Sequence, residues 1–173
     1  MDTLQLTNYR RFKDTGIIHL KPITFLVGAN SSGKSSFLKF FPLLKQSLGV
    51  NRNGTFLWYS KDVDFKDFQN TVHDGEGNIH ICFTFPLHNN QQARYRFRHI
   101  SERKDSLANI EIEKSVELCV KLEISAKQLK ANTNEDYLSQ LIIEYLDQVI
   151  NIQISESGKV NVVINDRNID TVF

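Results

Sequence analysis

The sequence predicts an α/β fold in which a mixed sheet carries one amphipathic helix near the N-terminus and an antiparallel β-meander follows. Two observations predict it. An apolar run at residues 23–27 precedes a glycine- and serine-rich loop, and a helical pattern begins at Lys34. After residue 78, segments of alternating hydrophobicity recur between polar turns, as is typical of antiparallel strands.

The first half of the chain supplies three predicted strands and the helix. Residues 2–9 alternate polar and apolar, residues 17–20 form a second short strand after a polar loop, and residues 23–27 are apolar on both faces. This last pattern favours a buried central strand. The helix over residues 34–48 has its apolar positions at Phe37, Leu38, Phe41, Leu44 and Leu48. Pro42 removes a backbone donor, so we expect a kink there.

The second half is predicted to be mostly strand. Strands are expected at 79–87, 94–100, 107–112 and 116–124, a helix at 134–149, and a closing hairpin at 151–155 and 159–165. We divide the chain into a core (1–50), a β-rich lobe (51–133) and a helix with a hairpin (134–173). The last residues are apolar and look like part of an element, so we expect the chain to be an N-terminal, truncated portion of a longer protein.

Composition narrows the class of protein. The chain has 173 residues, 40% of them apolar and 24% charged, with a net charge of +1. These values suit one ordinary globular domain and give no global field for a nucleic acid. The sequence has no signal peptide and no apolar run of about 20 residues, so we expect a cytoplasmic protein without a membrane partner. Cys82 and Cys119 lie in apolar runs and are expected to be buried, with neither a disulfide nor a metal.

The loop at residues 28–35 carries the chemistry. It reads Gly28-Ala29-Asn30-Ser31-Ser32-Gly33-Lys34-Ser35 and fits the phosphate-loop pattern G-x-x-x-x-G-K-[ST] without a mismatch. The glycines permit backbone angles that let N–H groups surround an anion, and the following helix adds its positive end. Lys34 supplies a charge to the β- and γ-phosphates, and the Ser35 hydroxyl is a ligand for Mg²⁺. We therefore predict that residues 28–36, including Ser36, bind a nucleoside triphosphate.

Three segments together resemble a known group. Leu6-Thr7-Asn8-Tyr9-Arg10-Arg11-Phe12, Leu20-Lys21-Pro22-Ile23-Thr24-Phe25-Leu26-Val27 and the phosphate loop through Leu38 are similar to the opening of ABC-type ATPases of the SMC, RecF and OLD kind. Residues 63–68, with His73, resemble a segment of anti-phage members that include the Septu-type ATPases.

The resemblance implies a fold, ligands and partners. The fold is the P-loop NTPase fold of an ABC-ATPase head, and two copies of the head enclose two ATP molecules with Mg²⁺. Many members act on DNA or work with a nuclease, in antiviral defence or DNA maintenance. Arg10, Arg11 and Phe12 match a region near the nucleotide or the DNA, and Gln69 is a candidate for the glutamine that contacts Mg²⁺ and water in ABC ATPases.

Two elements of such an ATPase are missing. The sequence has no Leu-Ser-Gly-Gly signature and no acidic Walker B strand. Residues 162–166 end in an acid but alternate like a hairpin strand, and Glu144 lies in the predicted helical stripe. We therefore expect hydrolysis from a complete dimeric ATPase and not from residues 1–173 alone. The alternatives are a non-hydrolysing, nucleotide-responsive assembly or sensor module, and a P-loop phosphotransferase.

Three arginines on one predicted strand have two possible interpretations. Arg94, Arg96 and Arg98 alternate with two aromatic residues, which suits either a solvent-facing strand or a stripe that contacts a phosphate backbone. Gln91 is a second candidate for the glutamine of the ABC type. The five histidines are scattered without ligand spacing.

Overall fold

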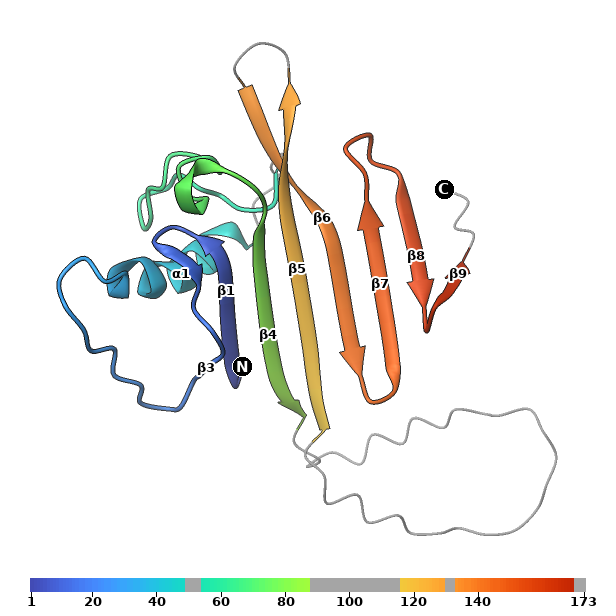
Figure 1. Cartoon of the computed structure of the whole chain (residues 1–173), viewed down its shortest axis with the longest axis horizontal. Coiled ribbons are helices and arrows are strands. Elements are labelled where there is room, and N and C mark those ends of the chain that lie inside the picture. The colour runs from blue at the N-terminus through green and yellow to red at the C-terminus, as the bar shows by residue number, and fades with distance from the viewer. Residues whose placement is uncertain (49–53, 88–115, 130–132, 170–173) are drawn as a thin grey trace, which may run out of the picture.

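The computed structural model describes residues 1–48, 54–87, 116–129 and 133–169. One antiparallel sheet runs through all of these ranges, in the order β2-β1-β4-β5-β6-β7-β8-β9, with β3 pairing β1 (Figure 1). The strands are β1 (Thr3–Tyr9), β2 (Phe12–Asp14), β3 (Ile18–His19), β4 (Ile79–Leu87), β5 (Val116–Leu129), β6 (Thr133–Tyr145), β7 (Gln148–Ile154), β8 (Val160–Ile164) and β9 (Arg167–Ile169). Helix α1 (Lys34–Ser47) packs on one face, and a 3-10 turn, η1 (His73–Gly75), precedes β4.

Most of the predicted strands are confirmed, and the helix at 134–149 is wrong. That segment forms β6 and the start of β7, joined by a tight turn in which Leu146 has a φ of 52°. Pairing with β5 sets Leu141 beside Leu122 and Ile143 beside Val120. Both faces of β6 carry apolar residues, so their spacing in the sequence resembles the stripe of an amphipathic helix. The segment is nevertheless a strand, because it pairs with β5 along its whole length. The predicted strands at 94–100 and 107–112, with Gln91 and the three arginines, lie outside the described residues.

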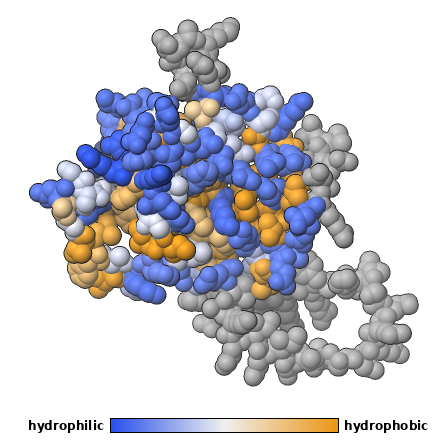
Figure 2. Space-filling model, viewed as in Figure 1, coloured by the Kyte–Doolittle hydropathy of each residue, from blue (hydrophilic) through white to orange (hydrophobic). Residues whose placement is uncertain are grey.

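The predicted buried strand at 23–27 is the second correction. The segment is not paired with any strand in the described part of the chain, and Ile23, Phe25 and Val27 are 74%, 84% and 90% exposed. Only Leu26 packs against the core from this run. Figure 2 shows hydrophobic residues gathered at the lower left, over the segment between β3 and α1. An apolar run predicts burial only if neighbours cover it, and a sequence pattern does not supply those neighbours.

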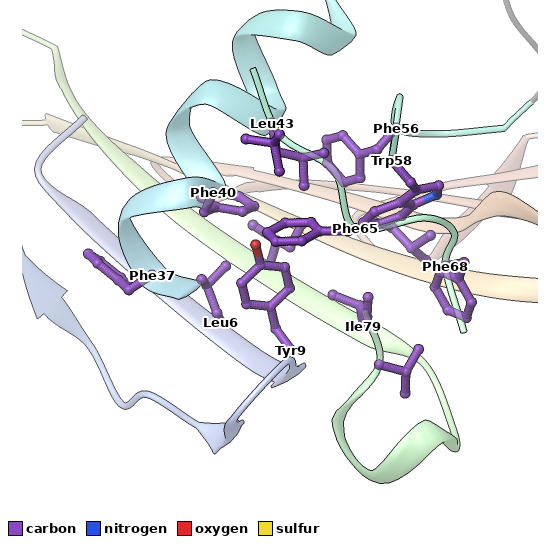
Figure 3. Close-up of a cluster of buried hydrophobic side chains, with 14 of the residues drawn as sticks. Leu6, Tyr9, Phe37, Phe40, Leu43, Phe56, Trp58, Phe65, Phe68 and Ile79 are labelled. Atoms are coloured by element: carbon purple, nitrogen blue, oxygen red, sulfur yellow. The ribbon is translucent and has the colours of Figure 1, made fainter. Parts of the chain in front are cut away.

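The core lies between α1, the sheet and the aromatic loop after residue 55 (Figure 3). Helix α1 contributes Phe37, Phe40 and Leu43, all nearly inaccessible to solvent, and runs through Pro42 without a break. The inward residues of β1 and β4 are Leu4, Leu6, Ile79 and Ile81, and Phe56, Trp58, Phe65 and Phe68 come from the loop. Leu38 and Leu48, which the predicted stripe included, are exposed.

Two buried polar side chains hold the aromatic loop in place. Gln46 of α1 donates to the carbonyls of Leu57 (2.5 Å) and Val63 (3.1 Å) and accepts from the Val63 N–H (3.0 Å). Asp136 of β6 accepts from the Trp58 indole N–H (2.8 Å) and the Thr55 N–H (2.6 Å). Both side chains are therefore buried with hydrogen-bond partners, which are backbone groups or an indole N–H.

Cys82 and Cys119 differ from the expectation of burial. Both are partly exposed free thiols on the polar face of the sheet, opposite α1. The same face carries Gln5, His80 and Lys121, and it has no helix over it among the described residues. No helix in the described ranges is long and apolar enough to cross a membrane.

Candidate functional site

The loop between residues 28 and 33 has a backbone that only certain residues adopt. Gly28, Ser31 and Gly33 all have positive φ, at 153°, 63° and 98°. A Cβ added at Gly28 would lie 3.1 Å from the Ser32 hydroxyl oxygen. At Gly33 a Cβ would lie 2.5 Å from Cζ of Phe12, because the Phe12 ring covers the glycine. The loop therefore needs glycine at position 33 for both its backbone angle and its close neighbour.

The first turn of α1 presents unpaired backbone donors. Gly33 is the N-cap residue, makes no side-chain cap hydrogen bond, and no acidic side chain lies in the first turn. The first intrahelical bond runs from the Phe37 N–H to the Gly33 carbonyl (2.9 Å), so the N–H groups of Lys34, Ser35 and Ser36 precede the helical ladder. Free donors at the positive end of a helix make an anion-binding site.

Lys34 lies folded across this loop. Its ammonium group donates to the carbonyls of Gly28 (2.8 Å) and Ala29 (2.6 Å) and lies 3.4 Å from the Ser32 hydroxyl oxygen. These three groups come from the same loop, so the lysine charge is held against the loop. The side chain is mobile enough to turn from carbonyl oxygens to phosphate oxygens.

A shallow hollow of about 220 Å³ opens at the helix N-terminus. Its lining consists of Arg11, Asn30, Ser31, Gly33, Lys34, Ser35 and Ser36. Six of these seven residues belong to the predicted loop, and the seventh is one of the two predicted arginines. Two positive side chains and no carboxylate face this hollow, so it is suited to an anion.

Tyr9 connects the end of β1 to the start of α1. Its hydroxyl lies 3.4 Å from the Ser36 carbonyl oxygen, and its ring meets Phe40 and Phe65 edge to face. Burial raises the pKa of Tyr9 well above its ordinary value, with a smaller opposing effect from Arg10. The hydroxyl therefore remains neutral, and the packing fixes the helix start relative to Arg10 and Arg11.

The two predicted arginines have different surroundings. The Arg10 guanidinium donates to the Asn70 carbonyl (2.6 Å) and lies over the Phe65 ring, 4.8 Å from its centroid. Arg11 is exposed and lines both the loop hollow and a neighbouring hollow of about 430 Å³ formed with Arg10, Asn70, Val72, His73 and Asp74. Arg10 thus holds the chain at this point, while Arg11 is exposed at the rim of both hollows.

The segment at 67–78 positions this pair. His73 Nδ1 lies 2.9 Å from the Arg10 carbonyl oxygen, and the Arg10 N–H donates to the Thr71 carbonyl (2.6 Å). Asn8 donates to the carbonyls of Glu76 (2.8 Å) and Asn78 (2.9 Å). The resemblance placed Phe12 in the segment near the nucleotide. The cover that Phe12 gives to Gly33 and the hydrogen bonds of Asn8 were not predicted, because each depends on a contact between residues distant in the chain.

Not every predicted residue reaches the hollow. Gly28, Ala29 and Ser32 shape the loop and hold Lys34, but they are not part of the hollow's lining. Gln69 donates to the Gly75 carbonyl and lines neither hollow. In the described ranges, no three His, Cys, Asp or Glu side chains gather as a metal site.

The acidic candidates lie elsewhere. Residues 162–164 belong to β8, which pairs antiparallel with β7 and β9, and Asp166 lies in the turn that follows. Four strands, β4 to β7, separate β8 from β1. The prediction of a hairpin strand in place of a Walker B strand is confirmed. Glu144 is on β6, bound to Lys121, so its predicted position on a helix was wrong.

The fold and the site together define a class of protein. A glycine loop, a helix N-terminus without a cap and a lysine folded over the loop are the parts of a P-loop nucleotide-binding site. The AAA ATPase domain family model matches residues 1–170, and the chain belongs to that family. It is thus a P-loop ATPase-domain protein, a class that binds nucleotide and usually uses Mg²⁺. No curated protein and no solved structure matches the chain.

Proposed function

We propose that the chain binds ATP and Mg²⁺ through residues 28–36 as part of an ABC-type head of the SMC, RecF and OLD kind. In this proposal, two complete heads hydrolyse ATP and so control a DNA-directed or nuclease-coupled activity, in anti-phage defence or DNA maintenance. The proposal that the chain binds a nucleotide is supported by one observation: the α1 N-terminus, Lys34 and Arg11 line the same hollow.

The residues have distinct roles toward the nucleotide. The N–H groups of Lys34, Ser35 and Ser36 donate to phosphate oxygens, and Lys34 exchanges its carbonyl partners for the β- and γ-phosphates. The Ser35 hydroxyl binds Mg²⁺, which neutralises charge on the β- and γ-phosphate oxygens when it is bound. Arg11 adds a second positive charge at the rim of the hollow.

Hydrolysis requires groups that the described residues do not bring to the hollow. A carboxylate normally holds Mg²⁺, and a further group orients the attacking water. None of the residues lining this hollow is acidic. The exposed side chains of Ile23, Phe25 and Val27 support the proposal that strands from further chain flank the run before the loop. The signature motif would come from a second head.

The test compares two lysines of α1 by isothermal titration calorimetry with MgATP. We expect Lys34→Ala to weaken binding at least about 10-fold, because it removes a charge-assisted contact. Lys39→Ala is the matched control, because Lys39 is exposed on the same helix and outside the hollow. Equal affinities of the two variants would contradict the proposed site.

A second function rests on the absence of an acidic group at the hollow in the described part of the chain. The protein would then bind ATP as a sensor or an assembly signal without turnover. Because residues 1–173 alone are not expected to hydrolyse ATP, phosphate release is measured on the protein as its own cell produces it, and this release distinguishes the two functions. Release well above background that disappears in Lys34→Ala supports the ATPase, while tight binding without release supports the sensor.

A further inference from the structure

The polar face of the sheet holds two thiols side by side. Cys82 lies on β4 and Cys119 on the neighbouring β5, with their sulfur atoms 3.7 Å apart. In the register, Cys82 pairs with Lys121 and Cys119 pairs with Thr84, so the two cysteines are diagonal neighbours on one face. Both are free and partly exposed. They are the only cysteines of the chain, so neither has a competing partner within it.

This separation is close to the one a disulfide needs. A disulfide has an S–S length of about 2.05 Å, and the sulfur atoms of this diagonal pair are 3.7 Å apart. The thiols are already in van der Waals contact, so the bond requires the sulfur atoms to approach by about 1.7 Å.

The two thiols have different surroundings. Cys82 lines a hollow of about 250 Å³ with Gln5, Thr7, His80 and Lys121, whereas Cys119 does not line it. Lys121 bonds to Glu144 of β6 (2.5 Å), so both charges lie on this face. Burial, followed by the hydrogen bond with Cys82, raises the pKa of Cys119 to about 12. The Cys119 thiol is therefore protonated at neutral pH, and it must give up its proton, to the hydroxide released in the first step, when its sulfur attacks Cys82.

We propose that Cys82 and Cys119 are an oxidative modification site, which forms a disulfide between β4 and β5 when the protein meets a hydroperoxide. This inference is independent of the nucleotide site, which lies on the other side of the sheet.

The chemistry balances with hydrogen peroxide as the oxidant. The Cys82 thiolate attacks one peroxide oxygen, the O–O bond breaks, and a sulfenic acid and hydroxide form. The Cys119 sulfur then attacks the Cys82 sulfur, the S–S bond forms, and the S–O bond breaks. The hydroxides take up the two thiol protons, so two thiols and one peroxide give one disulfide and two waters.

The experiment treats the 173-residue chain with a small excess of hydrogen peroxide, blocks free thiols and maps tryptic peptides under non-reducing conditions. We expect a peptide pair that joins Cys82 to Cys119 in the monomer, with the loss of two hydrogens in the intact mass. The melting temperature of the oxidised chain should exceed that of the reduced chain by a few degrees, because the bond restricts the unfolded state.

Two variants act as controls. Cys119→Ser cannot form the bond, so a sulfenic acid at Cys82 should accumulate and be trapped by dimedone. The double variant Cys82→Ser with His80→Cys moves the thiol two residues along the same face of β4, to the partner of Glu123, and should not link to Cys119. Linked peptides only between chains, or overoxidation of both cysteines without linkage, would overturn the proposal. So would equal linkage in the double variant.

Discussion

The ring of Phe12 lies over the backbone of Gly33, so close that a Cβ at position 33 would be 2.5 Å from Cζ of the ring. Phe12 is the first residue of β2, and Gly33 is the N-cap of α1. The contact therefore ties the strand that follows the arginines to the start of the helix, and it underlies the first prediction.

Gly33→Ala should lower both stability and nucleotide binding. The alanine would need a φ near 98° and would collide with Phe12, which together should cost about 2–4 kcal/mol of unfolding free energy. Urea denaturation and MgATP titration measure the two effects. Gly16→Ala is the matched control, because Gly16 also has positive φ but nothing lies within 4 Å of the added Cβ. If both variants lost the same stability, the contact with Phe12 would have no role.

Arg10 and Arg11 should separate into a structural and a binding residue. Arg11→Ala should weaken MgATP binding about 10-fold, because it removes a charge from the hollow, and should leave the melting temperature unchanged. Arg10→Ala should cost about 1–2 kcal/mol of stability, because it removes the bond to Asn70 and the contact with Phe65. Calorimetric binding and urea denaturation of both variants check this. The reverse pattern would show that Arg10 is the ligand-facing residue.

Gln46→Leu should destabilise the chain by about 2–3 kcal/mol, although leucine is more apolar. The change removes three hydrogen bonds from a buried side chain and leaves backbone groups of Leu57 and Val63 without those partners. Urea denaturation measures the cost. Lys45→Leu, at the exposed neighbouring position on α1, should change the stability by less than about 0.5 kcal/mol. If Gln46→Leu were as stable as the wild type, the packing of the aromatic rings alone would hold the aromatic loop in place.

Asp136→Ala should loosen the aromatic loop where it meets β6. The buried Trp58 indole N–H loses its acceptor, which should cost about 2–3 kcal/mol. Trp58 is the only tryptophan, so its fluorescence reports this site directly. We expect a red-shifted emission maximum in the folded variant and a lower urea midpoint. Asp147→Ala, in the exposed turn after β6, should show neither change.

Asp14 should make the free energy of unfolding depend slightly on pH in the acidic range. Its pKa lies below the ordinary value, because the Gln5 side chain and then the Gly16 N–H donate to the carboxylate. A lowered folded-state pKa gives stability that is present above the unfolded-state value and is lost as the pH falls through the folded-state value. Since the group is exposed, the contribution should be below about 0.5 kcal/mol.

The measurement is an NMR titration of the Asp14 carboxyl carbon in the wild type and in Gln5→Ala. We expect the variant to raise the Asp14 pKa toward its ordinary value of about 3.9. Gln153→Ala, whose amide bonds only to Asn161 among the described contacts, should not. An unchanged titration in Gln5→Ala would assign the lowered pKa to the Gly16 N–H and the Thr7 side chain instead of Gln5.

Local sequence determined the parts of this protein that depend on neighbours in the chain. The phosphate loop, the start of α1 at Lys34, and the strands β1, β4 and β8 could all be predicted, because turn chemistry, helix start and alternation are short-range properties. The same holds for the absence of a Walker B pattern at β8, where alternation indicated a hairpin strand.

Tertiary structure decided the rest, because burial and pairing depend on residues distant in the chain. Residues 134–149 have a helical pattern but form β6 and the start of β7, because β6 pairs with β5. The tertiary structure left Phe25 exposed although its segment is apolar, since no described strand lies beside it. It also gave Arg10 and Arg11 different partners and brought Cys82 within 3.7 Å of Cys119. The periodicity of a sequence indicates which face of a helix or strand is apolar. Which residues pack against that face depends on the tertiary structure.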